Sequence, residues 1–340
     1  MKNILVTGGL GYIGSHTVVA LQQAGFSVYI IDDLSNAQLE VWDKITGITG
    51  IQPVYYNIDL KDFNAVSVFL QSHKIDGIIH FAAYKAVGES VEKPLMYYRN
   101  NLMGLMNVLE AMEENQTDNF IFSSSCTVYG QADSMPINEA TPLKRPESPY
   151  GNTKKIGEEI IEDFVGATGK NAIALRYFNP VGAHNSATIG EVPNGIPNNL
   201  IPYVTQTAMG IRKSLGVFGD DYETRDGTAV RDYIDVNDLA DAHVKAMQRL
   251  LEGRNKSKLE FFNLGSGNGS TVLEIVTAFE QANNLKINYE IKPRRAGDIV
   301  QAYADYSFAK TELGWEPTTP LQTSMQTAWK FQQQLGKETK

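Results

Sequence analysis

Three residues of this chain have types and spacing suited to chemistry without a carboxylic acid beside them. Ser125 lies in "SSSCTVYG", after an apolar run, and Tyr150 and Lys154 lie four residues apart in "SPYGNTK". Residues four apart share one face of a helix. A phenol has a pKa of about 10, which a nearby cation lowers. Tyr150 is therefore expected to take a proton from a substrate hydroxyl while hydride leaves the same carbon, with Ser125 hydrogen-bonded to that oxygen.

The surroundings of Tyr150 carry this argument, because Tyr306 and Lys310 repeat the spacing. The "SP" before Tyr150 marks a helix start, and Ser125 ends a predicted strand. Ligands of parallel sheets bind beyond the carboxyl ends of the strands, where both segments should converge. A core aromatic at position 150 and a turn-forming serine at position 125 remain the alternatives.

A glycine-rich turn, "VTGGLGYIG", follows the first predicted strand and opens a helix. Gly9, Gly11 and Gly14 satisfy G-x-G-x-x-G, and Gly8 extends the pattern. Such glycines let a pyrophosphate rest on the helix N-terminus. Asp32 ends the next strand, where a carboxylate binds the adenosine ribose and repels a 2′-phosphate. The turn therefore predicts NAD rather than NADP, against the alternative of a glycine turn without a ligand.

Two further residues follow strand ends on the cofactor side. Asp59 ends the third predicted strand, where it either reads the adenine edge or caps a turn. Lys85, in "HFAAYK", follows the fourth strand. We expect its ammonium near the pyrophosphate, with simple solvent exposure as the alternative.

Short apolar runs alternate with helical patterns through the first half of the chain. The expected strands are NILVT, SVYIID, PVYYNID, GIIHFA, NFIFSSS and AIALRYF, and the expected helices span residues 11–24, 61–72, 94–114, 148–167, 238–253 and 271–283. This alternation predicts an α/β fold, a Rossmann-type doubly wound parallel sheet. We expect an NAD-binding domain over residues 1–180, with segments near 230–265 returning to it, and a smaller mixed α/β C-terminal substrate-binding domain over residues 181–340.

Composition excludes several classes of protein. The formal net charge of −9 argues against a general nucleic-acid binder, and no apolar run reaches the roughly 18 residues of a membrane span. Glycines interrupt the N-terminal apolar run, so no secretory signal is expected. Cys126 is the single cysteine, and the five histidines lack metal-ligand spacing. We expect a cytoplasmic protein without a metal site.

Four motifs, "TGGLGYIG", "SSSCTVYG", "SPYGNTK" and "LRYFNPVGAH", resemble those of the extended short-chain dehydrogenase/reductase superfamily. "HFAAYKAVGESVEKP", "IPNNLIPYV", "GTAVRDYIDVNDLA" and "PRRAGD" make the chain similar to the UDP-glucose 4-epimerase family. The similarity runs from Lys2 to about Trp315. The resemblance implies interconversion of UDP-glucose and UDP-galactose by inversion at C4 through a 4-keto sugar, with NAD retained.

The resemblance also assigns residues to each ligand. On the cofactor side it adds to the residues above, giving for NAD Gly8, Gly11, Tyr12, Ile13, Gly14, Asp32, Asp33, Leu34, Ser35, Asn36, Ala37, Asp59, Leu60, Phe81, Ala82, Ala83, Lys85, Asn100, Ser125, Tyr150, Lys154 and Phe178. For the UDP-hexose it implies Lys85, Ser125, Tyr150, Asn179, Asn199, Leu200, Phe218, Arg231, Arg295, Asp298 and Ala302. Arg231 and Arg295 would hold the diphosphate, and Asp298 the uridine ribose. Relatives are commonly homodimers, and "LMYYRNNLMGLMNVLEAM" either supplies such a face or belongs to the core.

Related 4,6-dehydratases carry an Asp–Glu pair after the serine or threonine that ends this strand. Here the matching residues are Cys126 and Thr127, which cannot supply both the acid and the base that elimination of water needs. The resemblance therefore favours epimerisation. A dehydratase, a decarboxylase, an epimerase for pentose or uronate substrates and a nucleotide-sensing regulatory protein remain the rivals.

Ala302 bears on the choice of sugar. Epimerases confined to UDP-glucose and UDP-galactose carry a bulky tyrosine at the position that it resembles, and a small residue leaves room for an acetamido group. The hypothesis is that UDP-GlcNAc and UDP-GalNAc are also substrates. The alternatives are that Ala302 only packs or that Tyr303 refills the space.

Overall fold

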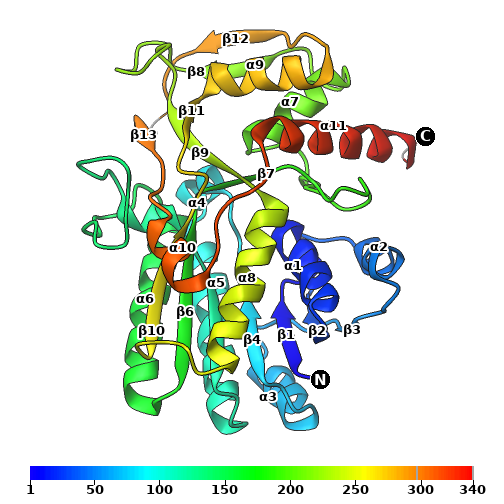
Figure 1. The fold of residues 1–340 in the computed structure, drawn as a ribbon, viewed down its shortest axis with the longest axis vertical. Helices are drawn as coiled ribbons and strands as arrows, with labels where there is room; N and C mark the ends of the chain where they lie inside the picture. Colours follow the sequence, from blue (N-terminus) through cyan, green and yellow to red (C-terminus); the bar gives the residue numbers. More distant parts are fainter. Residues whose placement is uncertain (296–297, 339–340) are drawn as a thin grey trace.

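The computed structural model describes residues 1–295 and 298–338 and contains a seven-stranded parallel sheet (Figure 1). Along the sheet the order is β10-β6-β5-β4-β1-β2-β3, and every neighbouring pair is parallel. This order is that of a doubly wound Rossmann fold, so the predicted fold class is confirmed. The strands are β1 (Asn3–Thr7), β2 (Ser27–Ile31), β3 (Val54–Tyr56), β4 (Gly77–His80), β5 (Asn119–Ser125), β6 (Asn171–Tyr177) and β10 (Leu259–Leu264).

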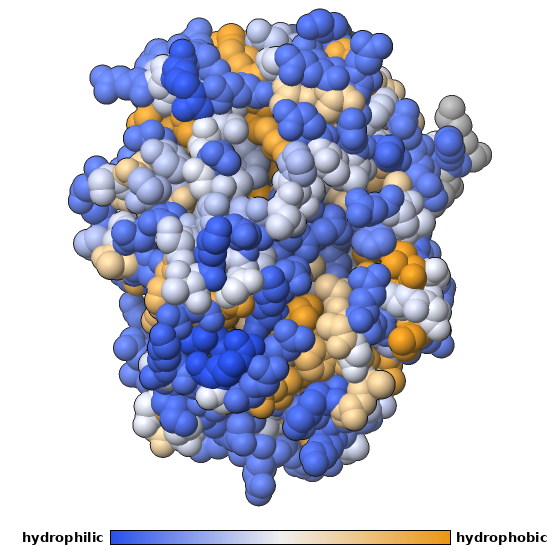
Figure 2. Space-filling model, in the orientation of Figure 1, coloured by the Kyte–Doolittle hydropathy of each residue, from blue (hydrophilic) through white to orange (hydrophobic). Residues whose placement is uncertain are grey.

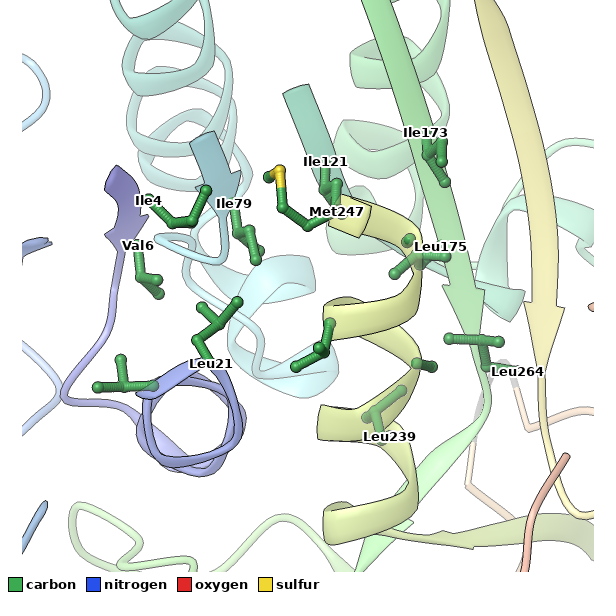
Figure 3. Close-up of a cluster of buried hydrophobic side chains, with 14 of the residues drawn as sticks. Ile4, Val6, Leu21, Ile79, Ile121, Ile173, Leu175, Leu239, Met247 and Leu264 are labelled. Carbon is green, nitrogen blue, oxygen red and sulfur yellow. The ribbon is translucent and has the colours of Figure 1, made fainter. Parts of the chain in front are cut away.

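Burial on both faces explains why the central strands are continuous apolar runs. Successive side chains of a strand point to opposite faces. Ile4 and Val6 therefore join one core cluster, whereas Leu5 between them joins the other. Figure 3 shows the first cluster, in which strand residues such as Ile4 and Ile121 meet Leu239 and Met247 of a covering helix. The edge strand β3 is the exception, because its residues are exposed or half-buried.

Helices cover both faces of this sheet. Two helices, α1 (Tyr12–Gln23) and α8 (Val236–Leu251), pack on one face, and α2 (Glu40–Thr49) packs on α1. The other face carries α3 (Phe63–Ser72), α5 (Pro94–Glu114) and α6 (Pro149–Thr168), with the short α4 (Val87–Glu92) nearby. The helices predicted from sequence are present with ends that differ by a residue or two, whereas α2 was not predicted.

The capping residues fix two helix starts. The side chain of Ser148 accepts a hydrogen bond from the amide of Gly151 (3.2 Å), and Pro149 occupies the first turn of α6. Proline has no amide hydrogen to leave unsatisfied there. Helix α6 therefore begins one residue before Tyr150. Asp62 caps α3 in the same way, which is why that helix begins two residues after the predicted start at Lys61.

The upper part of the molecule in Figure 1 is built from shorter elements. A four-stranded sheet contains β7 (Asn179–Val181), β9 (Val230–Asp235), β11 (Gly269–Thr271) and β13 (Gln301–Ala302), and β8 (Leu215–Phe218) pairs with β12 (Tyr289–Lys292). Helices α7 (Leu200–Ala208), α9 (Val272–Asn283) and α11 (Leu321–Glu338) enclose its own apolar cluster. Only β11 runs antiparallel to its partner. The part is therefore mixed α/β.

Chain order and spatial order differ between these parts. The segment that forms α8 and β10 lies on the large sheet, with β10 pairing β6, and α10 (Ser307–Leu313) packs against β10. The domain boundary at residue 180 stays a prediction.

The viewed face of the molecule is mostly polar, with smaller hydrophobic patches between (Figure 2). Within residues 1–295 and 298–338, no helix is both long and apolar enough to cross a membrane.

Candidate active site

A pocket opens at the carboxyl ends of the central strands, where ligands of such sheets bind. Most of the residues predicted for NAD line it. The lining consists of Gly8, Gly11, Tyr12, Ile13, Gly14, Ile31, Asp32, Asp33, Ser35, Asn36, Ala37, Ile58, Asp59, Leu60, Lys61, Phe81, Ala82, Ala83, Tyr84, Lys85, Asn100, Gly104, Ser123, Tyr150, Lys154 and Tyr177.

The glycine turn leaves no room for side chains. Gly8 has a φ of +70°, and a Cβ there would lie 2.8 Å from the amide nitrogen of Ala82. A Cβ on Gly14 would lie 2.2 Å from the carbonyl oxygen of Gly8. Gly11 precedes α1 and makes no side-chain cap. The first amide groups of α1 therefore stay available to an anion at the helix N-terminus.

Asp32 is held by backbone amides at the end of β2. Its carboxylate accepts hydrogen bonds from the amides of Leu10 (3.1 Å) and Leu34 (3.0 Å). Burial raises the pKa of Asp32, and these two hydrogen bonds oppose that rise. Leu34, predicted for NAD, has a φ of +59° and packs on the core rather than lining the pocket.

Asp59 fits both of the roles foreseen for it. Its carboxylate accepts the amide of Lys61 (2.9 Å), which makes a turn, and it also lines the pocket. The ammonium of Lys61 lies 2.8 Å from the same carboxylate and donates to the side chain of Asn100 (3.1 Å). Burial opposes the shift, but the bonds from Lys61 hold the pKa of Asp59 below its usual value.

Lys85 is paired rather than simply exposed. Its ammonium lies 2.8 Å from Oε1 of Glu191 and 5.8 Å from the centre of the Tyr12 ring. Nδ2 of Asn199 donates to the same Oε1 (2.6 Å). A residue predicted for NAD and one predicted for the nucleotide sugar therefore share a carboxylate.

Tyr150 and Lys154 line the pocket, and Ser125 lies next to Tyr150. The Ser125 hydroxyl lies close enough to Tyr150 to act on the pKa of its phenol, and Ser125 also caps the short helix Cys126–Tyr129 that follows β5. Lys154 Nζ lies 6.0 Å from the centre of the Tyr150 ring and donates to the carbonyl oxygen of Ser123 (2.6 Å). Ser125 itself does not line the pocket, whereas Ser123 does.

The low pKa expected for Tyr150 needs the charge of a bound nicotinamide as well as that of Lys154, and it stays a prediction. In the chain alone, burial raises the pKa of Tyr150 to about 12, and the Ser125 hydroxyl only partly offsets this rise. Burial also lowers the pKa of Lys154 to about 7. The Lys154 ammonium bonds to a backbone oxygen and is only partly charged at neutral pH, so it does not by itself produce a phenolate.

A buried polar network supports the strand that carries Ser125. Glu158, one helical turn after Lys154, accepts from Ser124 (2.5 Å) and forms two hydrogen bonds with Arg176 (2.8 and 2.7 Å). Arg176 in turn donates to the hydroxyl of Tyr129 (2.9 Å). Paired charges of this kind tolerate burial because each is hydrogen-bonded.

The residues expected to anchor the diphosphate meet around one carboxylate. Asp298 accepts from Arg231 (3.4 Å) and from Arg295 (3.0 Å). The Arg295 guanidinium lies 4.8 Å from the centre of the half-exposed Phe218 ring. Arg294 pairs instead with exposed Asp221. Positive charge is thus gathered where the resemblance places the diphosphate.

The other residues predicted for the sugar belong to β13, β7 and the start of α7. Ala302 of β13 pairs in register with Arg231 of β9 and is buried in a cluster with Phe178 that Cys126 adjoins. Phe178 does not line the pocket, although it was predicted for NAD. Asn179 begins β7, and Asn199 and Leu200 begin α7. None of these lines the pocket, and their roles stay predictions.

Some pocket residues were missed from the sequence. Tyr177 ends β6, and its hydroxyl is hydrogen-bonded to that of Ser123; both lie at strand ends, which was the available signal. Lys61 and Tyr84 directly follow predicted residues. Glu191 lies in a loop without a motif, so nothing in the sequence pointed to it. No group of residues that would hold a metal ion occurs in the part of the chain that the structure describes.

Comparisons with known proteins agree with this geometry. A family model described as GDP-mannose 4,6 dehydratase matches residues 5–328. UDP-glucose 4-epimerase of Neisseria meningitidis serogroup A is 48% identical over 97% of this chain and 97% of its own. UDP-glucose-4-epimerase from Stenotrophomonas maltophila, solved with bound NAD and formylated UDP-arabinopyranose, is 45% identical, with a TM-score of 0.95 over 99% of this chain and 100% of that chain.

A second solved structure is also similar over nearly the whole chain. UDP-glucose 4-epimerase from Bifidobacterium longum, in complex with NAD+ and UDP, is 42% identical, with a TM-score of 0.94 over 98% of each chain. Likeness of this extent over the whole chain, together with the Tyr150–Lys154 pair beside a dinucleotide pocket, places the chain in the UDP-glucose 4-epimerase family.

Proposed function

We propose that the chain interconverts UDP-glucose and UDP-galactose by inverting C4 of the sugar, with NAD retained in the pocket. The observation that carries the proposal is that Tyr150 and Lys154 line a dinucleotide pocket together, with Ser125 adjoining Tyr150. Relatives that are 42–48% identical to this chain are UDP-glucose 4-epimerases, which supports the proposal.

The residues present fit NAD. Gly8 and Gly14 lie too close to the backbone of Ala82 and of Gly8 to carry a Cβ, so the turn before α1 is tight, and α1 offers uncapped amides to the pyrophosphate. Asp32 would bind the adenosine ribose, and its charge disfavours a 2′-phosphate. When bound, NAD supplies the hydride acceptor for C4 and the positive charge of an oxidised nicotinamide.

Tyr150 would hold and return the proton of the C4 hydroxyl. With its pKa at about 12, the phenol of the ligand-free chain is an effective acid–base group only when further positive charge enters the pocket. Such charge also stabilises a phenolate that Ser125 hydrogen-bonds. Lys154, fixed to the Ser123 carbonyl, keeps its amine one helical turn from Tyr150.

The pocket favours inversion over loss of water. Burial raises the pKa of Cys126 to about 12, so this thiol neither donates a proton readily nor forms a thiolate at neutral pH. The neighbouring Thr127 hydroxyl is buried without a hydrogen-bond partner. Neither residue provides the acid and base that elimination needs. The keto sugar is left to take hydride back on its other face.

Inversion requires that the sugar turns while its nucleotide stays fixed. Arg231 and Arg295 present two guanidinium groups beside Asp298, and guanidinium groups form charge-assisted hydrogen bonds with a diphosphate. Arg231 is mostly buried, with 17% of its side chain exposed. The nucleotide is therefore anchored away from the hexose.

Incubating the as-purified protein with UDP-galactose and no added cofactor tests the proposal. UDP-glucose should appear, with no change in mass or net redox state, and NAD should stay bound to the protein through purification and turnover. A sugar product that has lost a molecule of water would contradict the proposal, and so would the absence of turnover by protein that contains NAD.

A second proposal concerns N-acetylated sugars. Ala302 is buried beside Cys126 and Phe178 at the strand end that carries Ser125. The ring of the next residue, Tyr303, lies against Gly269, and it does not belong to the cluster around Ala302. We propose that UDP-GlcNAc and UDP-GalNAc are interconverted as well.

Ala302→Tyr tests this second activity. A tyrosine there would fill the space for an acetamido group, so turnover of UDP-GalNAc should fall at least roughly tenfold more than turnover of UDP-galactose. The ratio of kcat/KM for the two sugars is the measurement. Equal losses for both sugars, or no turnover of UDP-GalNAc by the unaltered chain, would count against it.

We also propose a cytoplasmic homodimer. Leu95, Met103 and Met106 of α5 are exposed apolar side chains, and a helical face of this kind is suited to association. Light scattering of the purified protein would give the mass of the dimer, twice 37.6 kDa, or that of the single chain, which would refute the dimer.

A further inference from the structure

The loop between β7 and α7 lies across the cofactor side of the molecule. It runs from residue 182 to residue 199 without a helix or strand, and a loop of this length inside a compact fold usually has a function. The carbonyl oxygen of Gly182 accepts from the hydroxyl of Tyr12 (2.7 Å), and Asn194 donates to the side chain of Asn36 (3.0 Å). Both partners line the pocket, so the loop is fastened to it at two places.

Glu191 makes the third attachment and differs from the other two. Its Oε1 accepts from Lys85 (2.8 Å) and from Asn199 (2.6 Å). The Glu191 side chain is only 13% exposed, against 45% for Lys85. Both hydrogen bonds lie in exposed surroundings, where an ion pair contributes little to stability, so the contact orients Lys85 and Asn199 rather than holding the fold together.

Asn199 uses its side chain to bind Glu191 and does not cap α7 in the usual way. It is the N-cap of α7, a position where asparagine side chains usually accept a backbone amide. No such hydrogen bond forms here. The Asn199 amide group is instead turned to Glu191, at the start of the helix that leads into the substrate side.

We propose that Glu191 is a positioning residue that couples the cofactor pocket to the nucleotide-sugar site. Its carboxylate binds both Lys85, at the cofactor pocket, and Asn199, at the start of α7. When NAD fixes the Lys85 side chain, Glu191 and Asn199 are held in the positions that the nucleotide needs. When the nucleotide fixes Asn199, Lys85 is held in the same way for NAD. Coupling of this kind is reciprocal: nucleotide binding slows the loss of NAD, and NAD tightens the binding of nucleotide.

The proposal rests on the function proposed above, and its test is separate from turnover. NAD release is followed by dilution into a solution with an enzyme that consumes free NAD, with and without UDP, which has no hexose to react. In the unaltered protein UDP should slow release at least roughly fivefold, the lower range of known couplings. In Glu191→Gln, which keeps the size of the side chain, the ratio should fall to near one.

Two further variants isolate the effect. Asn194→Ala removes an attachment of the same loop that does not reach Asn199, so it should speed NAD release while the effect of UDP persists. Glu252→Gln removes the carboxylate of an ion pair with Arg254, outside the pocket, and should change neither. Since Glu191 does not touch Tyr150 or Lys154, Glu191→Gln should raise KM more than it lowers kcat.

The outcomes separate this inference from the proposed function. A purified protein that contains no NAD would overturn the proposed function and the coupling with it. If the protein holds NAD and UDP changes the rate of NAD release equally in the unaltered chain and in Glu191→Gln, only the coupling would be overturned. Thermal unfolding of Glu191→Gln close to that of the unaltered chain would exclude misfolding as the cause of a lost response.

Discussion

The dinucleotide pocket and the arginine cluster around Asp298 differ in how their polar groups are satisfied without a ligand. In the pocket, Lys154 is buried and bonded to the carbonyl oxygen of Ser123, and Asp32 accepts two backbone amides. In the cluster, Arg295 is exposed and shares Asp298 with Arg231. One site is fixed by the fold, and the other is held by side chains that can exchange partners.

This difference separates chemistry from binding. Groups fixed by backbone contacts stay in place whether or not substrate is present, which favours catalysis. Arg231 and Arg295 share Asp298, and their guanidinium groups can bind a diphosphate instead when the substrate is present. Substitutions in the pocket should therefore lower kcat, and substitutions in the cluster should weaken affinity.

The largest effect is expected for Lys154→Met, which keeps the length of the side chain but removes its amine. Loss of the amine beside Tyr150 should lower kcat roughly 100-fold or more, because positioned acid–base groups contribute about that much. Affinity for UDP should stay within about threefold. Stopped-flow turnover and calorimetry measure the two, with Lys155→Met, the next residue along the helix, as a control that should retain activity. If Lys154→Met mainly weakened the affinity for UDP instead, the assignment of chemistry to the pocket and of binding to the arginine cluster would be contradicted.

A smaller effect is expected for Arg231→Gln. Loss of a charge-assisted hydrogen bond should raise the Kd for UDP roughly 10- to 100-fold, with kcat at saturation little changed. The matched control is Arg294→Gln, whose guanidinium pairs with exposed Asp221 and which should change the Kd less than about threefold. Equal effects of the two substitutions would show that the cluster does not anchor the diphosphate.

The last expected effect concerns stability in acid rather than the site, and it separates the large sheet from the upper part. Burial lowers the pKa of His16 and of His80 to about 3, and that of His243 to about 4. These groups stay neutral when folded but take up protons when unfolded below about pH 6.5. Stability is therefore lost as pH falls from about 6.5 toward 4, by up to ~1.4 kcal/mol per pH unit for each histidine.

Hydrogen exchange at pH 7.5 and pH 5 tests this expectation. The three histidines belong to α1, β4 and α8, so amides on the large sheet should lose more protection in acid than those of α9 and α11. His243→Gln should reduce that loss. An equal loss of protection in both parts would contradict the expected difference.

The pattern of the sequence was sufficient for six of the seven strands of the large sheet, most of which are buried on both faces, and for helices that carry their own start signals; β10 was not predicted as a strand. Ser148 and Pro149 show where α6 begins, which fixes the place of Tyr150. The amphipathic α2 and α11 were missed; Leu39, the residue before α2, makes no side-chain cap.

The partners of the site residues were less predictable. Lys85 and Glu191 are 106 residues apart, and no motif links them. The pKa of Tyr150 depends on burial, which spacing along a helix does not reveal. Motifs therefore identified which groups face a ligand, whereas the neighbours that tune those groups follow only from the fold.

The central claim is that Tyr150 carries the proton of the C4 hydroxyl while a retained cofactor holds the hydride. Tyr150→Phe tests it most directly, with NAD content and UDP affinity measured on the same preparation. The account predicts that both are retained while kcat for UDP-galactose falls by roughly 100- to 10,000-fold. A variant that contains NAD, binds UDP and interconverts the sugars at the unaltered rate would contradict it.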